Sequence, residues 1–225
     1  MPLNKSKGNM YEFVTHTWNP IKGECSHNCA YCYMKRWGPQ NPIYLNEKEM
    51  FTNFGQDKFI FIGSSTDIFA ENVSDEWIKK VLKKCCYNVE NSNNNFFFQT
   101  KNPVRLLKYI NSIPKRSKIC TTIETNDFLS EIMGGCPTPE KRAHAMREIS
   151  NYFETYVTIE PIMKFDFLAL LDIIKLCKPV QVNIGADSGK NNLPEPTYDQ
   201  IEELVYEISH FANVHIKSNL SRLKI

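Results

Sequence analysis

The feature that most constrains the fold of this chain is the repeated alternation of short apolar stretches with amphipathic ones. Nearly continuous apolar runs are typical of parallel strands buried on both faces, and the amphipathic stretches between them are typical of crossover helices. Strands are predicted at residues 13–18, 58–62, 96–101, 118–123, 156–159, 180–184 and 214–216. Helices are predicted at residues 74–87, 103–111, 138–151, 165–177 and 197–211.

The length of 225 residues limits the size of the barrel that such units can build. A complete eight-unit barrel takes about 250 residues. We therefore predict an α/β fold, a partial (βα)6 TIM-like barrel with parallel strands and an extra C-terminal strand. A doubly wound flat sheet is the alternative. Residues 1–225 are expected to form a single domain, with residues 1–10 as a loose N-terminal lead-in.

Composition and charge indicate the compartment. Charged residues make up 23% of the chain, the formal net charge is +2, and nothing in this balance indicates a nucleic-acid binder. The N-terminus has no signal-peptide core, and no apolar run approaches the roughly 20 residues that span a bilayer. We expect a cytoplasmic protein without membrane contact, in which thiols stay reduced and clustered cysteines favour metal binding over disulfides.

Three cysteines, Cys25, Cys29 and Cys32, have the spacing C-x3-C-x2-C. One short loop can wrap these thiolates around a small metal centre. A structural zinc site needs four protein ligands, and most electron-transfer cubanes are held by four cysteines. Three thiolates on a cubane leave one iron open, as a catalytic site requires. Tyr31 directly precedes the third cysteine and could pack against a ligand of that iron.

Two other interpretations of these cysteines stay open. His27 or His16 could supply a fourth ligand and complete a zinc site. The cysteines could also lie close together without any metal. Zinc would turn the chain into a non-catalytic, metal-stabilised binding module.

Polar residues also follow the other predicted strands. In parallel barrels the reaction site lies at the C-terminal ends of the strands. Helix capping explains some polar residues at such places. The rest favour one wide polar pocket, and its candidate cofactor-binding residues are Ser64, Ser65, Asp67, Lys101, Glu124 and Glu160.

The C-x3-C-x-aromatic-C motif resembles the signature of the radical S-adenosylmethionine (SAM) superfamily. Further motifs, spread over about residues 13–217, resemble a phage-associated radical SAM family of largely unassigned function. More distantly they resemble spore photoproduct lyase, a thymine-dimer repair enzyme. These motifs lie at residues 17–20, 64–69, 99–103, 123–125, 159–162 and 185–189.

The resemblance implies a [4Fe-4S] cluster on the three cysteines and SAM chelated at the open iron. Reductive cleavage of SAM would give a 5′-deoxyadenosyl radical that abstracts hydrogen from a substrate, with electrons from an external donor of the flavodoxin or ferredoxin type. It implies a nucleic acid or nucleotide as substrate, with a peptide or small metabolite as the alternative. The implied SAM contacts are Tyr31, Ser64, Ser65, Lys101 and Glu124.

One departure from the lyase concerns its hydrogen-donating cysteine. An approximate alignment places Ser64 at that position, and a serine is a poor hydrogen-atom donor. Thymine-dimer lyase activity is therefore not expected. Cys136, in a glycine–proline loop, is the candidate replacement donor, whereas Cys120 is expected to be a buried, small apolar residue.

Overall fold

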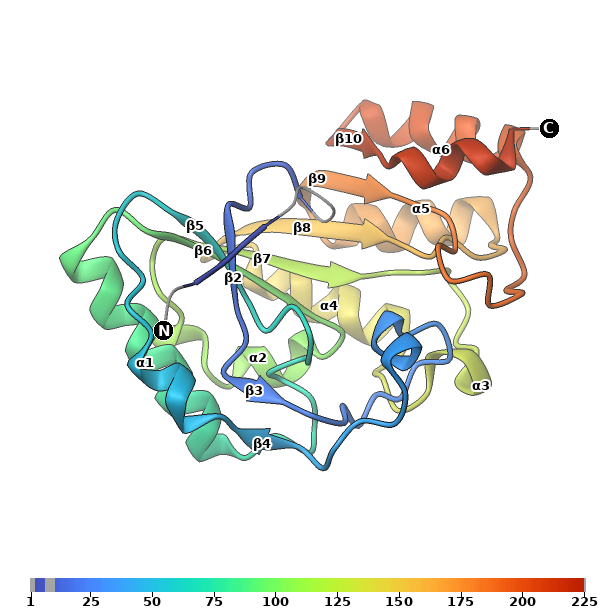
Figure 1. Ribbon diagram of the computed structural model, residues 1–225. Helices are drawn as coiled ribbons and strands as arrows, with labels where there is room; N and C mark the ends of the chain where they lie inside the picture. The colour runs from blue at the N-terminus through green and yellow to red at the C-terminus, as the bar shows by residue number, and fades with distance from the viewer. Residues whose placement is uncertain (1–2, 7–10, 225) are drawn as a thin grey trace.

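The computed structural model describes residues 3–6 and 11–224 of the chain. Within these residues, eight strands form one sheet in the order β1-β2-β5-β6-β7-β8-β9-β10 (Figure 1). All neighbours from β2 to β10 are parallel, and β1 is antiparallel to β2. A doubly wound sheet reverses its strand order at a switch point, whereas this order follows the sequence throughout. The prediction of a partial parallel barrel with an extra C-terminal strand is therefore confirmed.

The boundaries of the elements follow the predicted alternation of strands and helices. The strands of the sheet are β1 (Asn4–Lys5), β2 (His16–Trp18), β5 (Phe59–Ile62), β6 (Asn95–Thr100), β7 (Ser117–Thr122), β8 (Glu154–Ile159), β9 (Pro179–Ile184) and β10 (Asn213–Ile216), and a separate small sheet pairs β3 (Ile21–Lys22) with β4 (Tyr44–Leu45). The helices are α1 (Asp75–Asn91), α2 (Pro103–Leu107), α3 (Ser130–Met133), α4 (Pro139–Ile149), α5 (Phe167–Leu176) and α6 (Tyr198–Ser209). Short 3-10 helices cover Tyr33–Trp37, Glu47–Phe51, Ile110–Ser112 and Ser218–Leu223.

The structure differs from the sequence prediction mainly near the N-terminus. The first parallel strand, β2, begins at His16 rather than at residue 13. The chain turns just before it, and in this turn the Val14 amide donates to the Tyr11 carbonyl (3.0 Å). Within the expected lead-in, Asn4–Lys5 forms β1 on the edge of the sheet. The other lead-in residues, 1–2 and 7–10, lie outside the described part of the chain.

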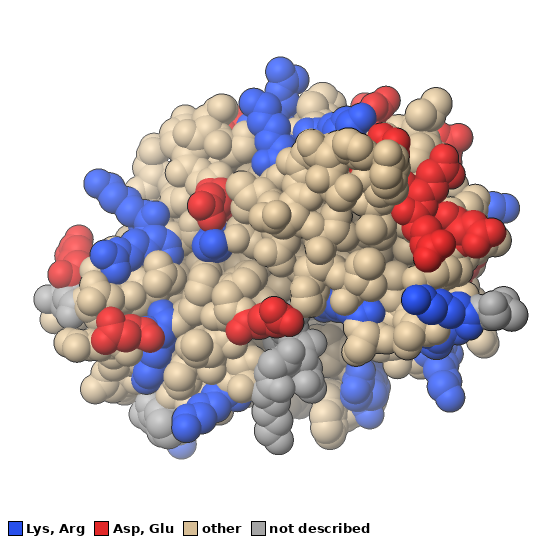
Figure 2. Space-filling model, turned by 90° about the horizontal axis from the view of Figure 1, so that it is seen from above, with Lys and Arg blue, Asp and Glu red and all other residues tan. Residues whose placement is uncertain are grey.

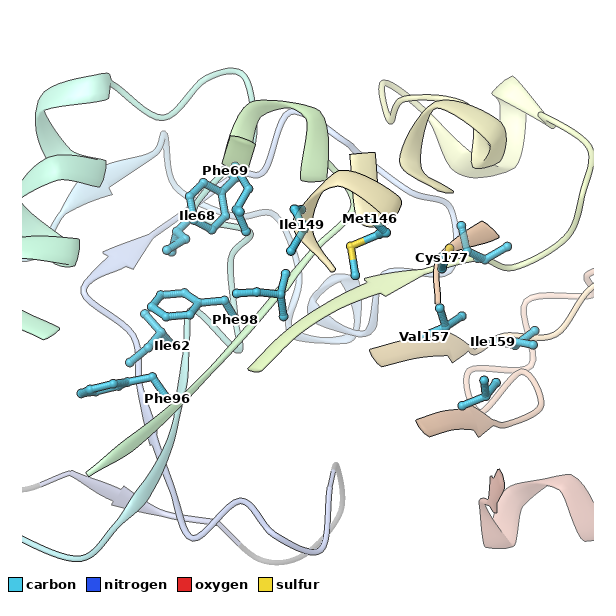
Figure 3. Packing of buried hydrophobic residues seen from close by; sticks show 14 of the residues in the cluster. Ile62, Ile68, Phe69, Phe96, Phe98, Met146, Ile149, Val157, Ile159 and Cys177 are labelled. Atoms are coloured by element: carbon cyan, nitrogen blue, oxygen red, sulfur yellow. The ribbon is translucent and has the colours of Figure 1, made fainter. Parts of the chain in front are cut away.

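The two faces of the sheet carry different clusters of buried side chains. Successive side chains of a strand point to opposite faces, so Phe96 and Phe98 of β6 pack toward the helices while Phe97 points to the concave face. Figure 3 shows the helix-side packing, in which the ring centres of Phe98 and Phe69 lie 6.3 Å apart. The concave cluster is smaller and consists of Tyr11, Val14, Phe61, Phe97, Cys120 and Tyr156.

The predicted helix starts at residues 74, 138 and 197 are the N-caps of α1, α4 and α6. Ser74 and Thr138 each accept a hydrogen bond from the third backbone amide of their helix, and Thr197 forms a capping box with Gln200. These caps fix the helices beside the strands that precede and follow them. None of the helices in residues 3–6 and 11–224 is long and apolar enough to cross a membrane.

Candidate functional site

The cysteine loop lies next to α3, beyond the C-terminal end of β7 (Figure 1). Cys25 and Cys32 are half-buried, Cys29 is buried, and all three thiols are free. Two tight turns shape the loop: the Asn28 amide donates to the Cys25 carbonyl and the Cys32 amide to the Cys29 carbonyl, both at 3.1 Å. The loop therefore presents three thiols from one short segment.

The geometry of the loop bears on the zinc alternative. The described residues contain no group of three or more His, Cys, Asp and Glu side chains that could hold a single metal ion. His27 is 2% exposed, and its Nε2 lies 2.9 Å from Oδ2 of Asp67. His16 lies on β2 and bonds through Nδ1 to the Thr15 hydroxyl (2.9 Å). One ring nitrogen of each histidine is therefore occupied by a hydrogen bond to another side chain.

Asp67, in the turn after β5, ties the cysteine loop to the sheet. Its carboxylate accepts hydrogen bonds from the ring of His27, from the Thr100 hydroxyl (2.9 Å) and from the backbone amide of Lys101 (2.8 Å). Burial raises the pKa of Asp67, but the hydrogen bonds, led by the one from His27, outweigh burial and lower it. Asp67 therefore stays charged and holds His27 against β6.

Glu124, just after β7, is the centre of a buried polar network. Its side chain has no solvent exposure, and its Oε1 accepts from the Lys101 ammonium (3.0 Å) and from the Tyr31 hydroxyl. Its Oε2 accepts from Nη1 of Arg142 (2.8 Å). The Lys101 nitrogen also lies 5.0 Å from the centre of the Tyr31 ring. Three of the predicted cofactor contacts, Tyr31, Lys101 and Glu124, thus meet in one network.

The cations set the electrostatics of this network. Burial raises the pKa of Glu124, but Arg142 and Lys101 outweigh it and hold that pKa well below its usual range. Burial lowers the pKa of Lys101, and the Glu124 carboxylate reverses this and raises it. Two cations therefore face one carboxylate, which leaves an excess positive charge in a buried place. Such a place favours a further anion.

Arg142 is a functional candidate that the sequence analysis missed. Its side chain on α4 is fully buried, and besides Glu124 it donates to the backbone carbonyls of Thr122 and Pro137, both at 2.7 Å. Its Nη2 has no hydrogen-bond partner among the described residues. A buried guanidinium nitrogen without an acceptor is costly, so Arg142 has a donor left for an anionic ligand. The signal in the sequence is the spacing of Pro139, Arg142, Met146 and Ile149, which puts the arginine on the buried face of its helix.

The serine turn after β5 is fastened to the segment that precedes the cysteine loop. Asn19, which the sequence analysis included only within the motif at residues 17–20, accepts from the Ser64 hydroxyl and from the Ser65 amide, both at 3.1 Å. The Tyr33 hydroxyl donates to the Ser64 carbonyl (2.7 Å). At Gly63, with φ at 74°, a Cβ would lie 2.6 Å from the Ile68 side chain, so the turn requires glycine.

Glu160 belongs to a different part of the rim. Its carboxylate accepts from the Lys217 ammonium and from the amide group of Asn219 (2.9 Å), both of which follow β10. Gly185 lies so close that a Cβ there would be 2.7 Å from Oε1 of Glu160. Glu160 therefore connects the last three strands of the sheet, and it makes no hydrogen bond or ion pair with the Glu124 network among the described residues.

Cys136, the candidate hydrogen donor, lies beside one of the loop cysteines. Its Sγ is 3.6 Å from Sγ of Cys29. The hydrogen bond from Cys136 lowers the pKa of Cys29 to about 6, with Lys101 contributing, although burial opposes the shift. By contrast, burial raises the pKa of Cys25 to about 12. Cys120 lies elsewhere, fully buried on the concave face with its Sγ 3.4 Å from the Thr158 hydroxyl.

Solved structures of spore photoproduct lyase share the fold of this chain. A cysteine-to-alanine mutant of that lyase with dinucleoside spore photoproduct matches with a TM-score of 0.68 at 13% identity, over 96% of this chain and 79% of that one. The lyase complexed with dinucleoside spore photoproduct gives 0.66 at 13% identity, over 96% and 79%. A double mutant with bound AdoMet and dinucleoside spore photoproduct gives 0.57 at 12% identity, over 93% and 64%. At these identities the likeness shows a shared fold.

The chain belongs to the family described as "Protein of unknown function (DUF5131)", which matches residues 9–196. This match covers the cysteine loop, the Glu124 network and Cys136. No curated protein matches the sequence.

Proposed function

We propose that this protein is a radical SAM enzyme. The observation that carries the proposal is the meeting of the cysteine loop with the buried network of Tyr31, Lys101, Glu124 and Arg142. Cys25, Cys29 and Cys32 would hold a [4Fe-4S] cluster, and the iron without a thiolate would accept SAM. Cluster and SAM together would supply one-electron cleavage of the sulfonium and hydrogen abstraction from a substrate.

The network suits the polar end of SAM, which carries a carboxylate and an ammonium. Arg142 has a buried donor without a partner, and the Lys101 ammonium has three donors, one of which is used by Glu124. These two cations would bind the carboxylate. Glu124 and the carbonyl of Ser64 would accept from the ammonium, and Tyr31 would contact the bound molecule beside the open iron.

The remaining predicted cofactor residues take supporting roles in this proposal. Asp67 accepts four protein hydrogen bonds, two of them from the backbone amides of Phe69 and Lys101. We therefore assign Asp67 to holding the loop in place. Ser65 would order the serine turn through Asn19, and Glu160 would contact the nucleoside part from its position beside Lys217.

We propose a nucleotide or a nucleic acid as the substrate, because all three of the solved lyase structures above hold a dinucleoside spore photoproduct. A cavity of about 270 Å³ on the concave side supports this choice. The half-buried ring of Phe13 and the half-buried amide of Gln181 line this cavity, a combination that suits stacking and hydrogen bonding of a base. Basic and acidic side chains are interspersed on the face shown in Figure 2, so this face does not form a purely basic surface for phosphates.

We further propose that the chain belongs to the phage-associated radical SAM family. We also propose that it works in the cytoplasm with an external electron donor. All eight cysteines are free, which is typical of a reducing compartment. A flavodoxin- or ferredoxin-type protein would supply the electrons.

The test is anaerobic reconstitution with iron and sulfide, followed by reduction with SAM present and measurement of 5′-deoxyadenosine. The wild type is expected to form it, and Cys29→Ala is not. Cys86→Ala is the matched control, because Cys86 lies on α1 and its thiol donates to the Ser112 carbonyl (3.3 Å). Equal yields from Cys29→Ala and wild type would exclude the site. Adding nucleotides or peptides separately then tests the substrate: hydrogen exchange into peptides alone would exclude the nucleotide proposal.

A further inference from the structure

Cys136 faces a proposed cluster ligand from a distant part of the chain. Its sulfur lies 3.6 Å from that of Cys29, although 107 residues separate the two cysteines, and each is about 5% exposed. Two backbone hydrogen bonds hold the segments together, from the Gly135 amide to the His27 carbonyl (2.9 Å) and from the Ala30 amide to the Ile132 carbonyl (2.8 Å). The two thiols are therefore neighbours because of how the loops dock.

The glycines beside Cys136 make this docking possible. A Cβ at Gly134 would lie 1.9 Å from the His27 carbonyl oxygen, and one at Gly135 would lie 2.9 Å from that of Ser26. Any larger residue would push the Cys136 segment away from the cysteine loop. The close approach of the two sulfurs thus depends on two positions without side chains.

We infer that Cys136 is the resolving thiol of Cys29, so that the cluster-free chain forms a reversible Cys29–Cys136 disulfide with hydrogen peroxide. The Cys29 sulfur attacks one peroxide oxygen, the O–O bond breaks, and Cys29 sulfenic acid and one water form. The Cys136 sulfur then attacks the Cys29 sulfur, and the hydroxyl leaves with the Cys136 proton as a second water. Two thiols lose two electrons in total, and one peroxide is reduced to two waters.

The position of Cys136 determines which cysteine of the loop can form a disulfide with it. Cys25 and Cys32 make no hydrogen bond with another sulfur among the described residues, whereas Cys29 does so with Cys136. The disulfide would remove one ligand from the metal site and would protect Cys29 from oxidation to sulfinic acid, which cannot be reversed by thiols. The thiol chemistry stands by itself, while its effect on cluster assembly rests on the proposed function.

The experiment uses the cluster-free full-length chain and stoichiometric hydrogen peroxide. Remaining thiols are alkylated, and the chain is digested with trypsin without reduction. The expected product is peptide 23–35 linked to peptide 119–141, with fragmentation assigning the bond to Cys29 and Cys136, and with loss of the link after dithiothreitol. A disulfide within the cysteine loop, or Cys29 sulfinic acid beside an unmodified Cys136, would overturn the inference.

Two variants sharpen the result. In Cys136→Ser, the linked peptide is expected to be absent, and peroxide is expected to oxidise Cys29 to sulfinic acid. Cys120→Ser is the matched control, because Cys120 lies in the same peptide but contacts Tyr11 and Thr158 on the concave face, and it is expected to keep the link. If Cys136→Ser does not fold, the wild type alone decides: alkylation of Cys29 and Cys136 must fall together as peroxide is added, and independent losses refute the pair.

A second readout separates this inference from the proposed function. After peroxide, the wild type is expected to bind less iron on reconstitution, and dithiothreitol is expected to restore it. A chain that forms the disulfide but never cleaves SAM would refute the proposed function alone. A chain that cleaves SAM but never forms the link would refute the resolving role alone.

Discussion

The guanidinium of Arg142 binds the carboxylate of Glu124 at 2.8 Å, and neither side chain has any solvent exposure. This pair joins α4 to the end of β7. Because removing one partner leaves the other charge buried and uncompensated, the two are stable only together. The proposed cofactor site is therefore part of the fold before any ligand binds.

Substitution of Glu124 tests how strongly the network supports the fold. Glu124→Gln leaves Lys101 and Arg142 as buried, unpaired cations, and we expect a loss of about 3–5 kcal/mol in the free energy of unfolding. Urea denaturation followed by circular dichroism measures this loss. Glu154→Gln is the matched control: it breaks an ion pair with Lys118 (3.0 Å) in which Glu154 is 57% exposed, and about 1 kcal/mol or less is expected. Equal losses in the two variants would contradict a special role for Glu124.

The pH dependence of stability tests the same carboxylate. The folded-state pKa of Glu124 is depressed, so its contribution is fully present above the unfolded pKa of about 4.3 and is lost as pH falls toward the folded value. The difference in unfolding free energy between wild type and Glu124→Gln should be constant from about pH 7 to pH 5 and should shrink below about pH 4. A difference that grows on acidification would have the wrong sign.

Substitution of Asp67 tests whether the cysteine loop needs its anchor. Asp67→Asn replaces an acceptor oxygen by an NH2 group that faces donors from His27, Thr100 and Lys101. We expect several-fold less iron in the reconstituted variant, measured per folded chain, because the loop is no longer held. Asp172→Asn, on the exposed face of α5, is expected to bind as much iron as wild type. Full iron binding by Asp67→Asn would contradict the anchoring role.

Alanine substitutions at two glycines with similar backbone conformations test how much the docking of the cysteine loop contributes to stability. Gly134 has φ 64° and ψ −137°, and Gly38 has φ 84° and ψ −171°, so alanine at either position is strained by about 1–3 kcal/mol. Only at Gly134 would the new Cβ meet a carbonyl oxygen, whereas nothing lies within 4 Å at Gly38. Gly134→Ala should therefore destabilise the protein by about 1–3 kcal/mol more than Gly38→Ala in thermal or urea unfolding. Equal effects would mean that the docking contact is dispensable.

The sequence was sufficient for features that depend on neighbouring residues. The strand and helix pattern, the helix starts at residues 74, 138 and 197, and the parallel order of the sheet follow from local periodicity and from residue types typical of helix starts. The polar residues at the strand ends also predicted that Lys101 and Glu124 belong to the same cofactor-binding pocket.

Features that depend on long-range contacts were missed or incomplete. Arg142 was not considered because its partner, Glu124, belongs to a different element, and sequence spacing does not indicate which buried charges meet. Asn19 was not named as a site residue, since its contacts with Ser64 and Ser65 span more than 40 positions. The pairing of Cys29 with Cys136 likewise depends on loop docking that periodicity does not encode.

The most direct test of the central proposal is the electron paramagnetic resonance spectrum of the anaerobically reconstituted, reduced protein with and without SAM. Three thiolates leave one iron open, so a [4Fe-4S] signal is expected whose shape changes when SAM binds, together with about four irons per chain. A zinc-containing protein without a cluster signal, or a cluster signal that is identical with and without SAM, would contradict the account.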